Sequence, residues 1–344
     1  MRENWFVKRW KLWLGLAVSA VFLWLALRGL DLSDVWQHVR TANYLWIIPG
    51  VLVYFLAVVA RTWRWDYMLR PLKHVPLLRL FPVVVIGYMG NNVYPLRAGE
   101  VLRSFVLRER EEIPMSASLA TVIVERVFDG LVMLMFVFVA LPFTPIPGDD
   151  NGAIRTLVIG ASAAFFLALI VFFGLAAMPD RFYALAEWFS YKLFPTKIHH
   201  PLLTFLKRFL DGLESLRSFR SVLMIFFTSV VIWLLETVKY WFVMHAFDFE
   251  VTFFALMLMN GVVNLATTLP TAPGYIGTFD GPGIWVLTLY GVPEDIAAAY
   301  TGVLHAALWL PITLWGLYYM ARAGMRWSTF SHAVDMKEQE ALEA

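Results

Sequence analysis

The sequence predicts an all-α polytopic membrane protein with about six full transmembrane helices and two re-entrant helical hairpins. Hydrophobic residues make up 60% of the 344-residue chain, and apolar runs of roughly 18 residues or more recur, which is the length that crosses about 30 Å of hydrocarbon. In two further apolar segments, glycine, proline and asparagine interrupt the pattern. Because lipid offers no partner for free backbone groups, such breaks are tolerated only where protein buries them or a wet cavity reaches them.

Six apolar runs are expected to cross the membrane in full, with lysine and arginine gathered on one side of them. The runs are 11–28, 45–62, 116–142, 153–177, 221–246 and 296–321. The basic segments are 1–11, 61–79, 103–112, 178–220 and 322–344, whereas the opposite loops are acidic. Counting cations in this way places both termini and the loop 178–220 in the cytoplasm.

Two shorter segments, 77–107 and 252–291, are expected to form hairpins. Each consists of an apolar helix, a break and a second short helix. The first arms, 77–90 and 252–266, would extend only about 21–23 Å at 1.5 Å per residue. Re-entrant hairpins fit these lengths, although two short full spans would give the same loop sidedness.

The two halves of the chain, about 45–142 and 221–321, contain a span, a hairpin and a span in opposite orientations. Such an inverted repeat is typical of alternating-access carriers, whose site lies at the repeat interface. We therefore expect a single transporter domain over 1–330. The basic loop 178–220 is expected to carry an amphipathic helix on the inner leaflet, and 331–344 to be a short disordered tail.

The breaks in the two hairpins carry the chemistry expected of an anion site. Pro95 opens the second arm of the first hairpin, and Arg97, Glu100 and Arg103 follow on one helix face. Proline suits a first helical turn, whose free N–H groups attract anions. In the second hairpin Asp280 is a candidate N-cap. Two half-helix N-termini at mid-depth suit a phosphate or carboxylate headgroup, to which an arginine fork adds bidentate recognition.

Simpler roles remain open for two of these residues. Arg97 could pair only with Glu100 on the cytoplasmic side, and Asp280 could serve only as a helix cap. The candidate substrate-binding residues are Asn91, Asn92, Arg97, Glu100, Arg103, Asn264, Gly274, Tyr275, Gly277 and Asp280.

The span 116–142 carries Glu125, Arg126 and Asp129 near its middle. A charge at that depth costs at least about 2.5–3.5 kcal/mol, so it normally has a partner and a purpose. One arginine between two carboxylates leaves a negative charge over, which Arg97 or Arg103 could balance; purely structural bracing is the alternative. The residues expected to form a gating or charge network are Arg61, Arg64, Glu125, Arg126, Asp129, Glu236 and Lys239.

Other polar residues in the apolar segments have two interpretations each. Arg61 and Arg64 stand at a span end, where snorkelling to the interface explains them simply. Asn264 either bonds backbone at the break or binds a headgroup. His305 is either a proton carrier or a histidine buried beside aromatic residues.

Composition excludes several classes of protein. The chain contains no cysteine, which excludes disulfides, iron–sulfur clusters and thiolate catalysis. We expect no catalytic residue, metal site, cofactor or nucleic-acid partner. No ATP-binding P-loop is present in the sequence, so movement would be downhill or coupled to an ion gradient, and no motif names the ion.

Four motifs in order resemble the lysylphosphatidylglycerol synthase transmembrane region, or flippase-domain, family. They are Arg61-Thr-Trp-Arg64-Trp65, Gly87-Tyr-Met-Gly-Asn91-Asn-Val-Tyr-Pro95-Leu-Arg97-Ala-Gly99-Glu100, Glu125-Arg126-Val-Phe-Asp129 and Pro273-Gly-Tyr-Ile-Gly277-Thr-Phe. The resemblance covers about 45–322. It implies translocation of lipids: the family includes the membrane half of the multiple peptide resistance factor and stand-alone members associated with glycolipids, among them polyprenyl-monophosphate sugars. No soluble aminoacyl-transfer domain follows the last span, so the synthase activity is not expected.

Together these observations predict a non-enzymatic lipid flippase in the inner or plasma membrane, moving an anionic phospholipid or polyprenyl-phosphate glycolipid whose headgroup binds between the hairpins. Its partners would be membrane lipids and a lipid-modifying enzyme. One alternative is an integral-membrane polyprenyl-lipid transferase, which would need a carboxylate cluster; Asp149-Asp150 is the only outer pair. The other is a non-transporting scaffold subunit of an envelope-lipid enzyme, docked through 178–220.

Overall fold

The computed structural model describes residues 5–94, 97–143, 153–176, 188, 219–269 and 271–325, and within these segments every regular element is a helix. The α-helices are α1 (Trp5–Leu27), α2 (Leu32–Thr41), α3 (Ile47–Leu69), α4 (Leu77–Val93), α5 (Ala98–Glu111), α6 (Met115–Ala140), α7 (Ala153–Ala176), α10 (Phe219–Met244), α11 (Phe253–Ala266), α12 (Asp280–Leu289) and α13 (Glu294–Arg322). Short 3₁₀ turns are η1 (Tyr44–Trp46), η2 (Leu141–Phe143) and η4 (Pro273–Tyr275). Pro95, Asp149-Asp150, the tail 331–344 and most of the predicted amphipathic loop lie outside the described residues.

A long helix stands at each of the six predicted spans. Among the described residues, Tyr44–Leu69, α10 and α13 are long and apolar enough to cross a membrane. The end of α1 and α2, bent by 85° at their junction, would add a fourth if the pair is one span. α6 is as long as α10, at 26 residues, but carries three ionisable residues in its middle. The protein is an all-α polytopic membrane protein, as predicted, and the number of full crossings remains a prediction.

The two predicted hairpins appear as helix pairs interrupted by irregular backbone. α4 and α5 have 17 and 14 residues, and α11 and α12 have 14 and 10. At 1.5 Å per residue these helices measure only about 15–26 Å. α5 begins at Ala98 rather than at 96, and α12 begins at Asp280 rather than at 283. All four lengths remain compatible with the predicted re-entrant arrangement.

Three glycines bring α4 and α5 into close contact. A Cβ atom placed on Gly90 would lie 2.7 Å from the Cα atom of Gly99, and one placed on Gly87 would lie 2.9 Å from the Cβ atom of Arg103. Small residues allow such close approach of helix backbones in membrane proteins. The glycines therefore fix how the first arm of the hairpin lies against the second.

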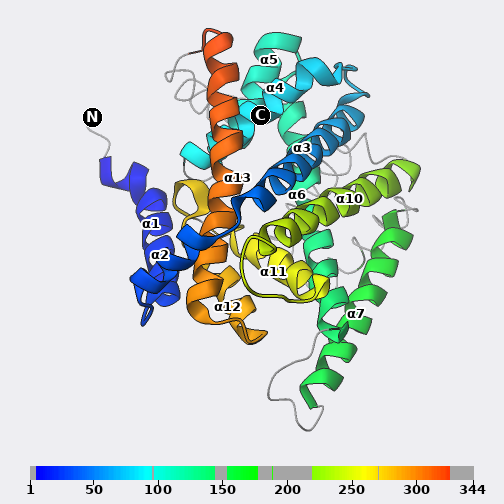
Figure 1. Ribbon diagram of the computed structural model, residues 1–344. Coiled ribbons are helices and arrows are strands. Elements are labelled where there is room, and N and C mark those ends of the chain that lie inside the picture. The colour runs from blue at the N-terminus through cyan, green and yellow to red at the C-terminus, as the bar shows by residue number, and fades with distance from the viewer. Residues whose placement is uncertain are drawn as a thin grey trace.

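The helix contacts exchange pairwise between the two halves of the chain. α3 packs against α10 at the centre (Figure 1). α4 packs against α13, and its counterpart α11 packs against α6; likewise α5 contacts α6, and α12 contacts α13. Each of these contacts has a counterpart when α3, α4, α5 and α6 are exchanged with α10, α11, α12 and α13, respectively. A two-fold relation between the halves requires this exchange, so the packing supports the predicted repeat.

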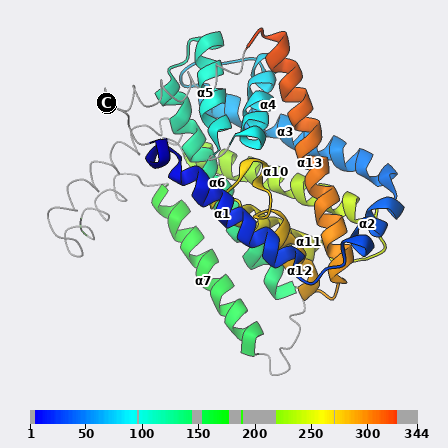
Figure 2. The ribbon, with the colours of Figure 1, turned by 90° about the vertical axis from the view of Figure 1, so that its left-hand side faces the viewer.

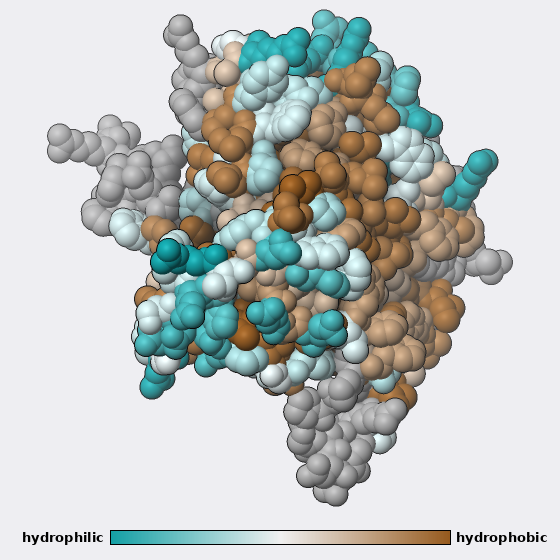
Figure 3. All heavy atoms as spheres, viewed as in Figure 1, coloured by the Kyte–Doolittle hydropathy of each residue, from teal (hydrophilic) through white to brown (hydrophobic). Residues whose placement is uncertain are grey.

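Helices outside the two halves lie at the edges of the bundle. α1 runs along one face, where it packs against α12, and α7 extends away from the bundle beside α6 (Figure 2). Hydrophobic side chains cover a broad zone between hydrophilic regions at the top and the lower left of the view in Figure 3. Leu45, Ile48 and Leu52 are more than half exposed. This distribution fits a bundle whose middle faces lipid.

Candidate functional site

A cavity of ≈ 150 Å³ lies where the two broken helix pairs meet. Both breaks and α3, α4, α5, α6, α10 and α13 contribute to its wall. Of the candidate substrate-binding residues, eight line it: Asn91, Asn92, Arg97, Glu100, Arg103, Asn264, Gly274 and Tyr275. Arg61, Arg126, Glu236 and Lys239 from the expected charge network line it too.

The remaining two candidates, Gly277 and Asp280, do not line the cavity. Gly277, at φ +83°, faces α1, where a Cβ atom would collide with the carbonyl oxygen of Ser19. The expectation of Asp280 as N-cap is wrong: the helix begins at Asp280 itself, and the N-cap is Phe279. The Asp280 carboxylate turns back instead, accepting from the backbone N–H of Gly277 at 2.8 Å, so it cannot cap the groups ahead of it.

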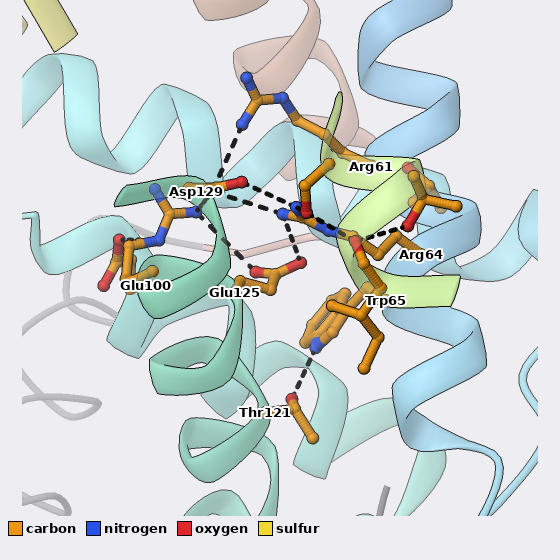
Figure 4. Close-up of polar contacts among 12 residues, drawn as sticks. Arg61, Arg64, Trp65, Glu100, Thr121, Glu125 and Asp129 are labelled. Carbon is orange, nitrogen blue, oxygen red and sulfur yellow. Dashed lines mark hydrogen bonds and ion pairs between the residues drawn. The ribbon is translucent and has the colours of Figure 1, made fainter. Parts of the chain in front are cut away.

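The two carboxylates of α6 are almost fully buried and bind several arginines (Figure 4). Asp129 accepts from Arg64 at 2.7 Å and from the indole N–H of Trp233 at 3.0 Å. Arg126 lies 3.4 Å from its other oxygen. Glu125 accepts from Arg103 and lies 3.5 Å from Arg64. The side chains from α3, α5, α6 and α10 are therefore held together at one depth.

Further ion pairs extend from α6 in two directions. Towards α10, Arg61 donates to Glu236 at 3.0 Å, and Lys239 donates to the other oxygen of Glu236. Arg61 also lies 3.9 Å from Asp129. Towards the first break, Glu100 lies 3.4 Å from Arg126 and 3.8 Å from Arg97. One connected ionic network results, comprising Arg61, Arg64, Arg97, Glu100, Arg103, Glu125, Arg126, Asp129, Glu236 and Lys239.

The ionic network carries more positive than negative charge. Among the described residues it contains six cations and four carboxylates, which leaves two positive charges over. The negative charge expected to remain in α6 is more than balanced, because Arg103, Arg64 and Arg61 all reach its carboxylates. Arg97 pairs with Glu100 rather than with the carboxylates of α6.

Snorkelling does not describe Arg61 and Arg64. α3 continues to Leu69, beyond the apolar run, so both arginines lie within the helix and are 7% and 1% exposed. The helix persists because its polar last turns are covered: the indole N–H of Trp65 donates to Thr121 at 2.9 Å, and Arg64 donates to Ser229 at 2.5 Å. Both arginines belong to the ionic network.

Several guanidinium groups retain unused hydrogen-bond donors. Among the buried side-chain atoms that the structure describes, the Nε atoms of Arg61, Arg64, Arg103 and Arg126 have no hydrogen-bond partner. Three of these arginines line the cavity. Leaving a buried donor unsatisfied costs about 1–3 kcal/mol, and more when the group is charged. Water or an oxygen-rich ligand in the cavity would satisfy these donors.

The size of the cavity limits what it encloses in this conformation. Sites for drug-sized ligands measure about 300–1,000 Å³, whereas this cavity measures ≈ 150 Å³. At about 30 Å³ per water it has room for roughly five water molecules. A single ionic group fits, and a complete glycolipid headgroup requires the helices to separate.

Arg97 connects the two breaks. Its guanidinium donates to the carbonyl oxygen of Thr267 at 3.1 Å and lies 5.9 Å from the centre of the Tyr275 ring. Its backbone is left-handed, at φ +55°, a conformation that costs a non-glycine residue free energy and that structures maintain mainly at functional sites. The residue is thus placed to respond when the two breaks move apart.

Beyond Tyr275, the aromatic residues of the cavity wall were not predicted. Lys239 lies 4.8 Å from the ring of Tyr54 and 5.2 Å from that of Tyr240, and Arg61 lies 4.7 Å from that of Trp233. Such cation–π contacts are strongest where the cation is desolvated. No sequence pattern marks these residues, because aromatic residues make up 16% of the chain and are not confined to the site.

The asparagines of the breaks are engaged with backbone. Asn264 donates to the carbonyl oxygen of Asn260 at 2.8 Å, and Asn92 donates to Thr313 at 2.8 Å and accepts at its own carbonyl from Trp309. Asn91 differs, since its side-chain oxygen is buried without a hydrogen-bond partner. Within the part of the chain that the structure describes, no cluster of three or more histidines or carboxylates is placed to hold a metal ion.

Comparison with known proteins assigns this chain to a family. The model of the lysylphosphatidylglycerol synthase TM region matches residues 12–316, which includes every residue of the ionic network. The chain belongs to this family. Relatives include a UPF0104 membrane protein of Methanocaldococcus jannaschii, 23% identical over 83% of this chain and 87% of its own length. Another UPF0104 membrane protein, from Methanothermobacter thermautotrophicus, is 26% identical over 79% of this chain and 83% of its own length.

One further relative bears the name of an enzyme. The glycosyltransferase AglD of Haloferax volcanii is 24% identical over 88% of this chain. The match covers 52% of AglD. The region of AglD that is similar to this chain is therefore about half of that protein.

Proposed function

We propose that this protein is a flippase that moves a phosphate-bearing lipid between the leaflets of the inner or plasma membrane. The headgroup phosphate binds in the cavity between the two breaks, and the tails stay in lipid. The halves of the protein rock about this site. The surrounding lipids are its partners, and a lipid-modifying enzyme that supplies the substrate is a further expected one.

The observation that carries the proposal is the excess of two positive charges around a cavity that is lined by buried arginines with unused guanidinium donors. Burying uncompensated charge is costly, and a phosphate group supplies both the missing negative charge and oxygen acceptors. Arginine is suited to this role because its planar fork matches phosphate geometry. The Nε atoms of Arg61 and Arg103, which have no hydrogen-bond partner, are the donors available to bind it.

The glycolipid class of substrate gains support from one relative. AglD is named as a glycosyltransferase, an enzyme class that makes sugar-bearing products, and a sugar on a polyprenyl phosphate combines such a product with a phosphate. The transferase alternative is less well supported by the site. All four carboxylates of the ionic network are paired with arginine or lysine, which leaves none of these four free for metal–phosphate chemistry.

The test is headgroup translocation in proteoliposomes with wild type and Arg97→Ala. Arg97 is the preferred target because it is a quarter exposed, so its removal disturbs folding less than removal of a buried arginine. A lost charged hydrogen bond is worth about 1.5–3 kcal/mol, which corresponds to roughly a 10–100-fold slower movement. A tagged polyprenyl-phosphate sugar is compared with a neutral lipid.

The matched control is Arg40→Ala, because Arg40 is exposed on α2 and away from the cavity. We expect phosphate-selective movement in the wild type and control and its loss in Arg97→Ala. Folded wild-type protein that moves no lipid faster than empty liposomes would contradict the proposal. Equal rates for phosphate and neutral lipids would contradict the assigned headgroup chemistry.

A further inference from the structure

His305 on α13 occupies a position in the cavity wall that the ionic network does not use. Its Nδ1 atom lies 2.8 Å from Oδ1 of Asp280, and its Nε2 atom lies 2.7 Å from the carbonyl oxygen of Gly274. The side chains of His305 and Asp280 are 14% and 15% exposed. The ring of Phe279 packs against the imidazole at a tilt of 35°, with centres 4.5 Å apart.

The partners of His305 determine how many protons the pair holds. A carbonyl oxygen only accepts, so Nε2 must carry a hydrogen. Between Nδ1 and Oδ1 a second hydrogen is then required, on either the imidazole or the carboxyl group, because two lone pairs 2.8 Å apart would repel. Oδ2 of Asp280 already accepts from Gly277. The pair thus holds one proton more than a neutral imidazole beside a carboxylate.

We infer that His305 and Asp280 form a proton-binding site, and that one proton moves together with the phosphate-bearing headgroup. The inference rests on the proposed flippase function and names its coupling ion. Protonation changes the net charge of the pair from −1 to zero. A bound anion in the same cavity is therefore favoured by the proton, and by linkage the anion favours the proton to the same extent.

The proton also controls the wall of the cavity. When it leaves, the single hydrogen left on the imidazole serves either the carboxylate of Asp280 or the carbonyl oxygen of Gly274, so His305 loses one of its two partners. A hydrogen on Nδ1 keeps the bond to Asp280 and releases the turn at Gly274 and Tyr275, both in left-handed conformations. Because Tyr275 lies beneath Arg97, release of the turn reaches the residue that connects the two breaks.

Other titratable and charged groups face the same cavity from every helix around it. They influence the affinity of the pair for its proton, and those that are arginine, lysine or glutamate belong to the ionic network. They are Tyr54 and Arg61 on α3, Tyr88 on α4, Arg97, Glu100 and Arg103 at α5, Arg126 on α6, Glu236, Lys239 and Tyr240 on α10, and Tyr275 in the second break.

A pH gradient across proteoliposomes tests the inference. The full chain is reconstituted with a tagged polyprenyl-phosphate sugar, and the lipid is measured in both leaflets at steady state, with and without a gradient of one pH unit. Movement of one proton per lipid predicts an about tenfold imbalance between leaflets. In His305→Gln and Asp280→Asn the ratio of tagged lipid between the two leaflets should fall to about one, even if the variants move lipid more slowly than the wild type.

The matched control is His38→Gln, because His38 and Asp295 form a similar pair at 3.0 Å outside the cavity. This variant should keep the imbalance of the wild type. A wild type that moves lipid without responding to the gradient would overturn the inference, and so would an imbalance that persists in His305→Gln.

Nitrogen NMR of labelled histidine in the wild type separates this inference from the proposed function and needs no variant. We expect the His305 ring to show a hydrogen on Nε2 and a second, shared hydrogen at Nδ1 at neutral pH. A bare Nδ1 would overturn the proton site even if lipid moves. If no lipid moves but the shared hydrogen is present, the flippase proposal fails and the proton site stands.

Discussion

Asp129, in the middle of α6, accepts three N–H hydrogen bonds and lies within 4 Å of three arginines. Removing its charge while keeping its shape leaves those arginines with one carboxylate fewer in a buried setting. For Asp129→Asn we expect the free energy of unfolding to fall by about 3–5 kcal/mol, the typical cost of breaking a buried ion pair. Denaturant unfolding in mixed micelles measures it.

The control for this substitution is Asp34→Asn on α2, where the carboxylate is exposed. A surface change of this kind should alter the free energy of unfolding by no more than about 0.5 kcal/mol. If Asp129→Asn were as mild as the control, the ionic network would not contribute to the stability of the fold as described.

Seven residues of the ionic network were predicted as a charge network, because charge inside an apolar segment is costly and stands out; Arg97, Glu100 and Arg103 were predicted as substrate-binding residues. Pairs close in sequence, such as Arg97 with Glu100, were predictable, whereas the partners that join different helices were not. Whether Arg97 or Arg103 reached Glu125 depended on the turn at the first break, and that turn begins with the left-handed backbone of Arg97. His305 and Asp280 are 25 residues apart, so only the folded break brings them together.

At the scale of helices, Gly277 determines how α1 sits on the bundle. A Cβ atom there would collide with Ser19 of α1, and the residue has φ +83°. We expect Gly277→Ala to lower the free energy of unfolding by about 1–3 kcal/mol, the range for strained backbone. The melting temperature in detergent reports the change.

Gly302→Ala serves as the matched control. Gly302 lies within α13, is exposed and has open space around its Cα atom. Alanine favours a helix interior over glycine by about 0.5–1 kcal/mol, so this variant should be stabilised slightly. Opposite signs for the two substitutions are the expected result; stabilisation by both would contradict the contact between Gly277 and α1.

Helix positions were predictable, and helix ends were less so. Apolar runs placed all six long helices, but α3 runs seven residues beyond the predicted end at 62, because burial against α6 and α10 outweighs its polar sequence. α2 was not expected, since its mixed polar sequence resembles a loop; Asp31 caps it by accepting from Ser33 at 2.8 Å. Such ends depend on neighbours that a single sequence does not display.

At the scale of the whole molecule, the predicted orientation has a direct test. The natural chain has no cysteine, so a single introduced thiol reports one position. In intact cells an impermeant thiol reagent should label Asp34→Cys from outside, whereas Arg79→Cys should label only after permeabilisation. Both positions are exposed. The reverse pattern would show that the basic side faces outward.

The pairwise exchange of helix contacts has an energetic consequence. A rearrangement in which the two halves trade conformations rebuilds the same kinds of contact, so the two end states have nearly equal helix-packing free energies. The ionic network breaks this balance, because eight of its ten residues belong to the first half and only Glu236 and Lys239 to the second. Each 1.4 kcal/mol of that difference changes the ratio of the two populations tenfold. If a few ion pairs set the ratio of the two conformations, binding of one anion and one proton is enough to shift it, and nucleotide hydrolysis is not required.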